Sequence, residues 1–479
     1  MIGKKGAAAG YGLILAAAIA LMSVGNVTAV TVTEPETVAE EEISSMDAEE
    51  QESAFAYDLF FKPENFGFSE AFVGDPMPYY EDGTYYIYYL KEGGDSFHHS
   101  VYLTTTQDFV SYQEYETPMI EASGEGQEDW IGTGSVVKTS DRYLFFYTAH
   151  ADAEEYHEKI YAAESTDLIS FEKIQGFEMV PDEEIGQKND FRDPQAYYDP
   201  ETGKIKMTIT AAVDGTARIL KYSLDADLTN AAYEGIIFTD PTGDFWNLEC
   251  SDTFKMGDKW YLTYSGQDDT LWYAKADEQY GPYDEPKRLE GKLFYAAKHV
   301  EDGEGSYMVG WARRSDNPFS RTVTAWAGNL MVQEMKQKEN GDLYLTVPEQ
   351  IRNAFPEEQS FTDTVSATET FKVTGSFIFR DAGTFGMAME DKYISIDPEA
   401  GLLQLGFAEG KLPIAETAVE LKDGETYSFT YMQDGSAGLF CIDGIGTLTV
   451  RIYGTCGKKI RFWSENSQME WKDLAFSTR

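Results

Sequence analysis

Residues 75–89 read Asp-Pro-Met-Pro-Tyr-Tyr-Glu-Asp-Gly-Thr-Tyr-Tyr-Ile-Tyr-Tyr. Aromatic and β-branched residues favour strands, and an Asp-Gly pair between two such runs is a strong signal for a tight hairpin turn. The segment therefore predicts two antiparallel strands that are joined at Asp82-Gly83.

Related segments recur along the chain at intervals of about 55 to 60 residues, beginning near Gly134, Asp193, Glu249 and Phe294. A period of this length, with about four strands in each repeat, is typical of a β-propeller, and five copies predict five blades. The innermost strand of each blade lines the central channel. Side chains at the starts of these strands should therefore meet at one mouth of the channel.

Three of these starts carry an acid: Asp75 in Gly-Asp-Pro, Asp193 in Arg-Asp-Pro and Glu249 in Glu-Cys. A single Asp-Pro is usually a turn residue, and a single Arg-Asp-Pro is more often a loop salt bridge than a site. The three acids indicate a common site because they stand at equivalent places of a repeat. We expect their carboxyl groups to converge.

The repeat stops after Pro348, and a new alternation begins near Phe355. Strands of about four to six residues with frequent turns indicate an antiparallel β-sandwich. The sequence thus predicts an all-β protein, with a five-bladed β-propeller over residues 55–350 and a β-sandwich over residues 356–479.

The N-terminus has the pattern of a signal peptide over residues 1–29, with Lys4 and Lys5 before an apolar run. Residues 30–54 are rich in Asp and Glu and predict a disordered acidic linker. We expect a secreted protein, with surface tethering as the alternative if the signal segment is not cleaved. Removing residues 1–29 would change the net charge from −45 to −47, because only two lysines are lost. Such a chain should repel nucleic acid and anionic membrane surfaces, and suits a neutral substrate.

The few cysteines and histidines do not predict a metal or redox site. Cys250 is interpreted as a buried structural residue, and pairing of Cys441 with Cys456 stays open. His98 and His99 are adjacent, and adjacent strand residues point to opposite faces, so they are interpreted as polar loop residues or substrate contacts rather than metal ligands. We expect no cofactor.

Two carboxylates on either side of a glycosidic bond are the minimum for glycoside hydrolysis. One must stay protonated near neutrality, and the other must be ionised. We expect the protonated group to be Glu249. The apolar residues Phe245, Trp246 and Leu248 precede it, and an apolar setting raises the pKa of a carboxyl group. Asp75 is the candidate for the ionised group, and a third acid, Asp193, could favour positive charge on the sugar ring.

The three acidic motifs, in this order and spacing, resemble those of glycoside hydrolase family 32, the invertases, inulinases and levanases. The segments 108–112, 132–135, 294–297, 310–312 and 326–330, and the C-terminal run 434–453, are also similar to strings of that family. The resemblance spans residues 57 to 475. It implies a five-bladed propeller with a β-sandwich, and a retaining double-displacement reaction on β-fructofuranosides such as sucrose, fructo-oligosaccharides, inulin or levan.

The resemblance also assigns roles. It implies that Asp75 is the nucleophile, Glu249 the acid/base and Asp193 the transition-state stabiliser. The residues expected to contact the carbohydrate are Arg192, Trp130, Thr133, Ser135, His99 and Trp311.

The chain departs from the family pattern around the first motif. Gly74 stands where the family has Asn, Leu90 stands where it has Gln, and residues 97–100 replace a Trp-rich stretch. Two alternatives follow: a non-catalytic carbohydrate-binding propeller, and a related furanosidase that acts on another sugar. The sandwich could be a support or an auxiliary sugar surface. The sequence says nothing about oligomeric state, about exo or endo action, or about hydrolysis against transfer.

Overall fold

The structure, a computed structural model, describes residues 55–57, 59–64, 70–93, 98–185, 188–315, 325–355, 358–381, 383–407 and 413–479. The predicted signal peptide and acidic linker, residues 1–54, lie outside the described residues. The regular secondary structure of the described chain consists almost entirely of strands, which confirms the all-β class. Among the described residues, no helix is long and apolar enough to cross a membrane.

The N-terminal part contains five successive groups of four antiparallel strands. The groups are β2 (Ala71–Glu81), β3 (Thr84–Gly93), β4 (Val101–Thr106) and β5 (Ser111–Ile120); β6 (Trp130–Lys138), β7 (Tyr143–His150), β8 (Glu158–Ser165) and β9 (Glu172–Lys173); β10 (Phe191–Asp199), β11 (Lys204–Val213), β12 (Thr216–Asp225) and β13 (Ala232–Thr239); β14 (Glu249–Met256), β15 (Lys259–Ser265), β16 (Leu271–Ala276) and β17 (Lys287–Glu290); and β18 (Phe294–Glu301), β19 (Ser306–Arg314), β20 (Ala325–Gln337) and β21 (Leu343–Thr346).

Three short elements and a further strand accompany the groups. These are β1 (Phe55–Tyr57), which pairs with β5, the 3-10 turns η1 (Gly126–Glu128) and η2 (Glu183–Ile185), and the helix α1 (Glu349–Arg352).

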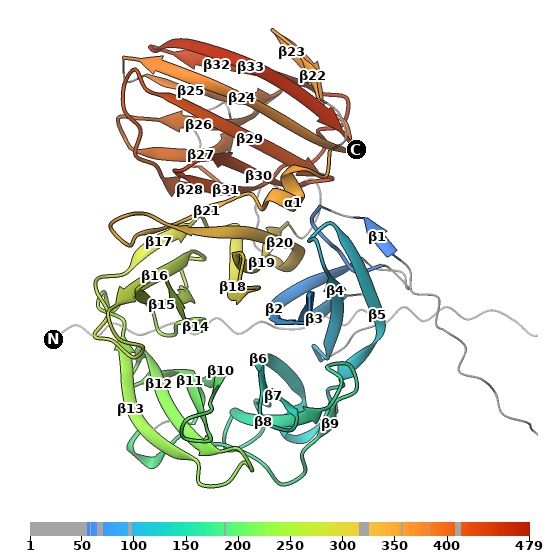
Figure 1. The fold of residues 1–479 in the computed structure, drawn as a ribbon, viewed down its shortest axis with the longest axis vertical. Coiled ribbons are helices and arrows are strands. Elements are labelled where there is room, and N and C mark those ends of the chain that lie inside the picture. Colours follow the sequence, from blue (N-terminus) through green and yellow to red (C-terminus); the bar gives the residue numbers. More distant parts are fainter. Residues whose placement is uncertain are drawn as a thin grey trace, which may run out of the picture. The chain divides into compact units, whose positions relative to one another are not determined.

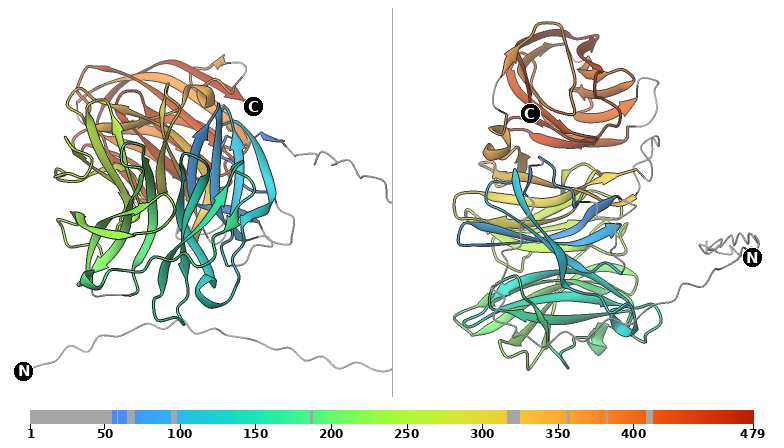
Figure 2. Two further views of the ribbon diagram at one scale, coloured as in Figure 1. Left: turned by 60° about the horizontal axis from the view of Figure 1, so that its bottom comes forward. Right: turned by 90° about the vertical axis from the view of Figure 1, so that its right-hand side faces the viewer.

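The first strands of the five groups form a closed ring. Contacts join β2 to β6, β6 to β10, β10 to β14, β14 to β18, and β18 back to β2. Figure 1 shows the groups following one another around a common centre, with these five strands innermost, and Figure 2 shows the same arrangement from two other sides. The first and last groups are also hydrogen-bonded into one sheet, where Val73 of β2 pairs with Gly328 of β20.

The quoted hairpin forms as its sequence predicts. Strands β2 and β3 pair from Met77–Tyr88 to Glu81–Thr84 around the turn. Asp82 and Gly83 both have positive φ, 48° and 84°, which is the conformation that a two-residue hairpin turn of this kind requires.

The C-terminal part is a sandwich of two six-stranded antiparallel sheets. One sheet has the order β22 (Gln359–Ser360), β33 (Gln468–Thr478), β24 (Thr370–Arg380), β29 (Thr426–Asp434), β30 (Ala437–Ile442) and β31 (Gly446–Arg451). The other has the order β23 (Thr364–Ser366), β32 (Lys459–Glu465), β25 (Thr384–Met389), β26 (Lys392–Asp397), β27 (Leu402–Phe407) and β28 (Ala415–Ala418).

The ring and the sandwich share a continuous core. Leu330 and Val332 of β20 belong to the same buried cluster as Leu439 and Cys441 of β30. Ile351 and Phe355 also pack in this cluster, so the connection between the two parts is itself buried.

Candidate active site

A β-bulge interrupts the first strand of every group near its start. The pairing register shifts between Gly74 and Met77, Gly132 and Gly134, Arg192 and Gln195, Glu249 and Asp252, and Tyr295 and Lys298. In four of the five bulges the first bulged residue has positive φ: Asp75 at 40°, Asp193 at 58°, Cys250 at 51° and Ala296 at 51°. A bulge re-aims a side chain, so the repeat turns one residue of each inner strand toward the same end of the ring.

The strand register corrects the prediction that the three acids occupy equivalent positions of the repeat. Asp75 and Asp193 occupy the bulge position, but in the fourth group that position belongs to Cys250. Glu249 stands one residue earlier, where the third group has Arg192 and the fifth has Tyr295. The three acids therefore come from two adjacent positions of the repeat.

Asp75 is held by two donors from other groups. Thr133 Oγ1 donates to Asp75 Oδ2 at 2.9 Å, and Trp311 Nε1 donates to Asp75 Oδ1 at 3.2 Å. Burial raises the pKa of Asp75, the charge of Glu249 adds to this, and the two hydrogen bonds oppose it. The carboxylate is thus fixed in orientation, with one hydrogen bond on each oxygen.

Asp193 is buried, with 3% of its surface exposed. The backbone N–H of Cys250 donates to Asp193 Oδ2 at 2.6 Å. Burial raises the pKa of Asp193 to about 6, against the opposing effects of Arg192 and the Cys250 amide.

Glu249 lies in a more polar setting than its sequence neighbours predict. Its Oε1 accepts from Arg192 Nη2 at 3.2 Å, its Oε2 accepts from the Tyr295 hydroxyl, and its side chain is 26% exposed. Of the apolar residues before it, Leu248 is fully buried in the core, whereas Trp246 is 49% exposed. The apolar residues that precede Glu249 therefore do not surround its carboxyl group, and Arg192 and Tyr295 bond it instead.

Arg192 lies within a cluster of carboxylates. Its guanidinium pairs with Glu158 at 2.9 Å, with Asp190 at 3.3 Å and with Glu249 at 3.2 Å. Burial opposes the charge of Arg192, but these carboxylates and Asp193 outweigh it and raise its pKa. Glu158 was not foreseen from the sequence, because it starts a third-position strand (β8) and belongs to no motif.

The three acids are linked through this network. Thr133 Oγ1 lies 3.7 Å from Cys250 Sγ while it donates to Asp75. The charge of Glu249 raises the pKa of both Asp75 and Asp193, and the charges of all three carboxyl groups raise the pKa of Cys250. The structure thus brings the acids together as the repeat predicts.

Apart from Arg192, the residues expected to contact the carbohydrate divide into two sets. Thr133, Ser135 and Trp311 are buried, at 2%, 5% and 0% exposure. Thr133 and Trp311 hold Asp75, and Ser135 Oγ donates to Pro194 O and accepts from Ala196 N, so its hydroxyl joins neighbouring strands. The expectation that these three contact the substrate is not supported, because their polar atoms are already used inside the protein.

Trp130 and His99 belong to the second set, which is accessible. Trp130 is 39% exposed, and the His99 side chain is 26% exposed. His99 stacks on Trp326 at 4.4 Å between ring centroids, and meets the edge of Trp130 at 4.7 Å. Trp326 takes the space above Gly74, where a Cβ would lie 2.1 Å from its ring, so the departure at Gly74 makes room for this indole.

A buried lysine lies behind the acids. Lys298 Nζ donates to Gly134 O at 3.0 Å and to Gln195 Oε1 at 3.1 Å, and so connects β18 with β6 and β10. Its charge lowers the pKa of Asp193, although burial dominates there. Lys298 was not foreseen from the sequence, because it belongs to no motif and its place directly after the β18 bulge depends on the strand register.

The structure has no metal centre among the described residues, where no three His, Cys, Asp or Glu side chains could hold an ion together. All three cysteines are free thiols, and burial raises the pKa of Cys250 well above its usual value. Cys250 thus contributes its backbone N–H to Asp193 rather than a reactive thiolate.

The comparisons with known proteins agree on one family. The N-terminal domain of glycosyl hydrolases family 32 matches residues 68–348. The chain belongs to glycosyl hydrolases family 32. A curated relative, sucrose-6-phosphate hydrolase of Escherichia coli, is 25% identical over 263 residues. That match covers 50% of this chain and 54% of the relative, so the chain spans about half the length of the curated relative that it matches.

Solved structures of family 32 share the fold. The β-fructofuranosidase of Bombyx mori has a TM-score of 0.68 at 17% identity, over 85% of this chain and 93% of that chain. The exo-inulinase of Aspergillus awamori has a TM-score of 0.69 at 16% identity, over 88% of this chain and 97% of that chain. The likeness includes the sandwich, because it extends far beyond residues 68–348.

Proposed function

We propose that this protein is a secreted retaining glycoside hydrolase that acts on β-fructofuranosides, and that its ring is a five-bladed β-propeller. One observation carries the proposal: in a chain of family 32, Asp75, Asp193 and Glu249 stand at or directly before the bulges of three inner strands, and the charges of all three act on Cys250. The candidate substrates are sucrose, fructo-oligosaccharides, inulin and levan.

Asp75 is the nucleophile in this proposal. Its ionised carboxylate attacks the anomeric carbon of the fructosyl unit, and a covalent ester forms as the glycosidic bond breaks. Thr133 and Trp311 each donate to one oxygen of Asp75, which keeps the attacking atom in place without a search over rotamers.

Glu249 is the acid and then the base. It gives its proton to the leaving oxygen, and in the second step it takes a proton from the water that releases fructose from Asp75. Tyr295 and Arg192 orient its two oxygens separately. Asp193 accepts a hydrogen bond from the Cys250 amide. In this proposal its negative charge stabilises the positive charge that develops on the sugar ring of the substrate.

The charges around the acids favour a neutral sugar. The E. coli relative is named for a phosphorylated substrate. Here Arg192 is already paired with three carboxylates, and Arg313, whose guanidinium lies over the rings of Tyr295 and Trp311, pairs with Asp269 at 3.0 Å. A phosphate would have to displace these partners. A mutant of the Bombyx mori β-fructofuranosidase, with the same fold, has been solved in complex with sucrose.

Exposed rings frame the acids and offer stacking faces for the substrate. Trp246 lies with its ring 5.1 Å from the Arg192 guanidinium, and Trp130 lies beside His99. Both indoles are exposed, at 49% and 39%. Apolar ring faces with a few fixed polar groups are the usual composition of a sugar site.

The test is hydrolysis by two variants, Asp75→Asn and Glu249→Gln, against a panel of sucrose, inulin, levan and arabinan. We expect release of fructose by the wild type, loss of at least about 10³-fold in both variants, and unchanged circular dichroism. Proton NMR of the first turnovers should show the β-anomer of fructose before mutarotation, as retention requires.

Three results would overturn the assignment. If the fructose that forms before mutarotation is the α-anomer, the retaining mechanism is refuted. Unaltered fructan binding by both variants together with no turnover of any glycan by the wild type would make the protein a carbohydrate-binding propeller. Release of arabinose alone would move it to another furanoside. Secretion is tested separately, by N-terminal sequencing of the exported protein, which should begin near residue 30 if the signal segment is cleaved.

A further inference from the structure

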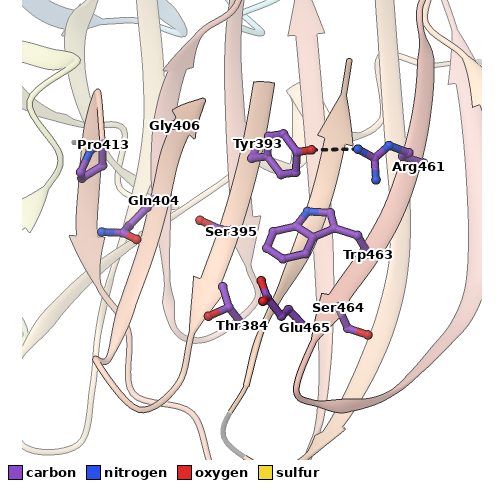
Figure 3. Close-up of a pocket in the computed structure, with 10 residues that line it drawn as sticks. All are labelled: Thr384, Tyr393, Ser395, Gln404, Gly406, Pro413, Arg461, Trp463, Ser464 and Glu465. Atoms are coloured by element: carbon purple, nitrogen blue, oxygen red, sulfur yellow. Dashed lines mark hydrogen bonds between the residues drawn. The ribbon is translucent and has the colours of Figure 1, made fainter. Parts of the chain in front are cut away.

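The sandwich carries a hollow of its own, remote in sequence from the acids. It has a volume of about 540 Å³ and lies on one face of the sheet that contains β25, β26, β27 and β32. Figure 3 shows the side chains that line it, which are Thr384, Tyr393, Ser395, Gln404, Gly406, Pro413, Arg461, Trp463, Ser464 and Glu465.

The alternation of the strands separates this face from the core. Phe385, Met387, Ile394, Leu405 and Ile460 point inward and are buried. The residues between them point outward. The lining side chains are therefore not required to fill the core of the sandwich.

Small residues form the floor of the hollow. Trp463, Gly386 and Ser395 are consecutive partners across three strands, and Ala388 and Gly406 flank Tyr393 in the neighbouring row. A Cβ at Gly386 would lie 2.0 Å from the Ile394 carbonyl oxygen, so this position cannot carry a side chain without moving the backbone. The depression is thus built into the sheet.

Two aromatic rings form its wall at an angle to each other. The Tyr393 and Trp463 centroids are 5.4 Å apart with the planes at 73°. Arg461 Nη2 donates to the Tyr393 hydroxyl at 2.9 Å, and its guanidinium lies 5.6 Å from that ring, so the tyrosine is held in place. Figure 3 shows the indole of Trp463 next to Tyr393 and above Thr384 and Glu465.

The polar groups of the hollow match a polyol. The indole N–H of Trp463 is buried and has no acceptor among the described residues. Ser395 and Thr384 offer hydroxyl groups, and Gln404 offers an amide that bonds Glu416 at 2.9 Å. Angled rings with hydroxyl, amide, guanidinium and carboxylate groups can receive a neutral sugar by stacking and hydrogen bonding.

We propose that this hollow is a second carbohydrate site, which binds fructosyl units of a β-fructan chain and performs no chemistry. The ligand class rests on the proposed function, since it assumes that the sandwich holds the polymer that the ring cleaves. Two sites on one chain raise the effective concentration of a polymer at the acids, but give no advantage with sucrose. The lining contains no pair of carboxyl groups from convergent strands like those of the ring, so binding alone is expected there.

The test is native electrophoresis of the full chain through gels that contain inulin or levan. The Asp75→Asn variant is the background, so that the polymer is not digested. We expect the gel to retard this protein, and Trp463→Ala to weaken the retardation at least about tenfold. Arg461→Ala should do the same without removing a ring, which covers the case in which Trp463→Ala fails to fold. Tyr197→Ala is the control, because Tyr197 is an exposed aromatic residue, at 46%, in the ring and away from the hollow.

Wild-type and Trp463→Ala proteins are compared in parallel on sucrose, where equal kcat/KM is expected. Absence of retardation by both fructans, or equal retardation with and without the hollow's residues, would overturn the second site. Retardation that depends on Trp463 in a protein that hydrolyses no fructoside would support the second site while refuting the proposed function. The two ideas thus fail separately.

Discussion

At the scale of single residues, Thr133 is the side chain that acts most directly on the proposed nucleophile. Its hydroxyl bond lowers the pKa of Asp75 against the effect of burial. Thr133→Val keeps the shape and removes the donor, so the pKa of Asp75 should rise further and the acid limb of the pH profile should move to higher pH. A hydrogen bond to a charged group is worth about 1.5–3 kcal/mol, which corresponds to a loss of roughly 10- to 150-fold in kcat/KM. The measurement is kcat/KM on sucrose against pH.

Ser135→Ala is the matched control for Thr133→Val, because its hydroxyl is also buried on β6 but bonds the backbone of β10. It should lower the melting temperature and leave the acid limb where it is. A shifted limb in Ser135→Ala with none in Thr133→Val would contradict the assigned role of Thr133.

Asp193 should show a conflict between stability and activity. Its pKa is about 6 in the folded protein and 3.8 for an ordinary Asp, so between these values the folded state holds a proton that the unfolded state has lost. The free energy of unfolding therefore falls as pH rises from about 4 to about 6, and stays lower above. Asp193→Asn should abolish hydrolysis yet raise stability at pH 7 by an amount on the order of 1–3 kcal/mol. Thermal melts at pH 4 and pH 7 test this, and a variant less stable than wild type at pH 7 would refute it.

At the scale of elements, the repeat could be read from the sequence because its signals are local. Aromatic runs and turn residues, as at Asp82-Gly83, predict the hairpins. Because the repeats have equivalent strand starts, residues that are distant in sequence can be predicted to lie near one another. The bulge could not be read, since a one-residue shift of pairing depends on contacts across strands. The offset of Glu249 from Asp75 and Asp193 was missed for that reason. The hydrogen bonds that Ser135 and Trp311 make inside the protein were not predicted, because the burial of these side chains depends on the assembled ring.

The pairing of β2 with β20 closes the ring and depends on a glycine. A Cβ at Gly328 would lie 1.8 Å from the Ala312 carbonyl oxygen, and Gly328 is the partner of Val73. Gly328→Ala should therefore push β20 away from Ala312 of β19, disturb the pairing with β2, and lower the free energy of unfolding by about 1–3 kcal/mol. Urea denaturation provides the measurement. Gly446→Ala is the control, because a Cβ at that strand position meets nothing within 4 Å, and its stability should be unchanged or slightly raised. Equal midpoints for both variants would show that the closure is not limited by Gly328.

At the scale of the whole molecule, a buried polar network joins the ring to the sandwich. Arg451 Nη2 donates to Ala312 O at 2.6 Å and its Nε donates to Arg313 O at 2.9 Å. Gln333 Oε1 accepts from Thr447 Oγ1 at 2.6 Å. Such groups are costly to leave unpaired in a dry interface, so the two parts should unfold together in one transition rather than separately.

Glu290 makes this joint sensitive to pH. It is fully buried on β17, accepts from the backbone N–H of Thr449 on β31, and burial raises its pKa to about 8 from 4.5. Between these values the folded state keeps a proton that the unfolded state releases, so the stability that this group supports at low pH is lost as pH rises toward 8. Glu290→Gln stays neutral and can still accept from Thr449. It should remove that slope and exceed wild type by roughly 2–4 kcal/mol above pH 8. Glu470→Gln, on the exposed part of β33, is the control and should keep the wild-type slope. The measurement is the denaturation midpoint at pH 5, 7 and 9. If the midpoints of wild type and Glu290→Gln change in parallel with pH, Glu290 is already ionised in the folded protein and the prediction is wrong.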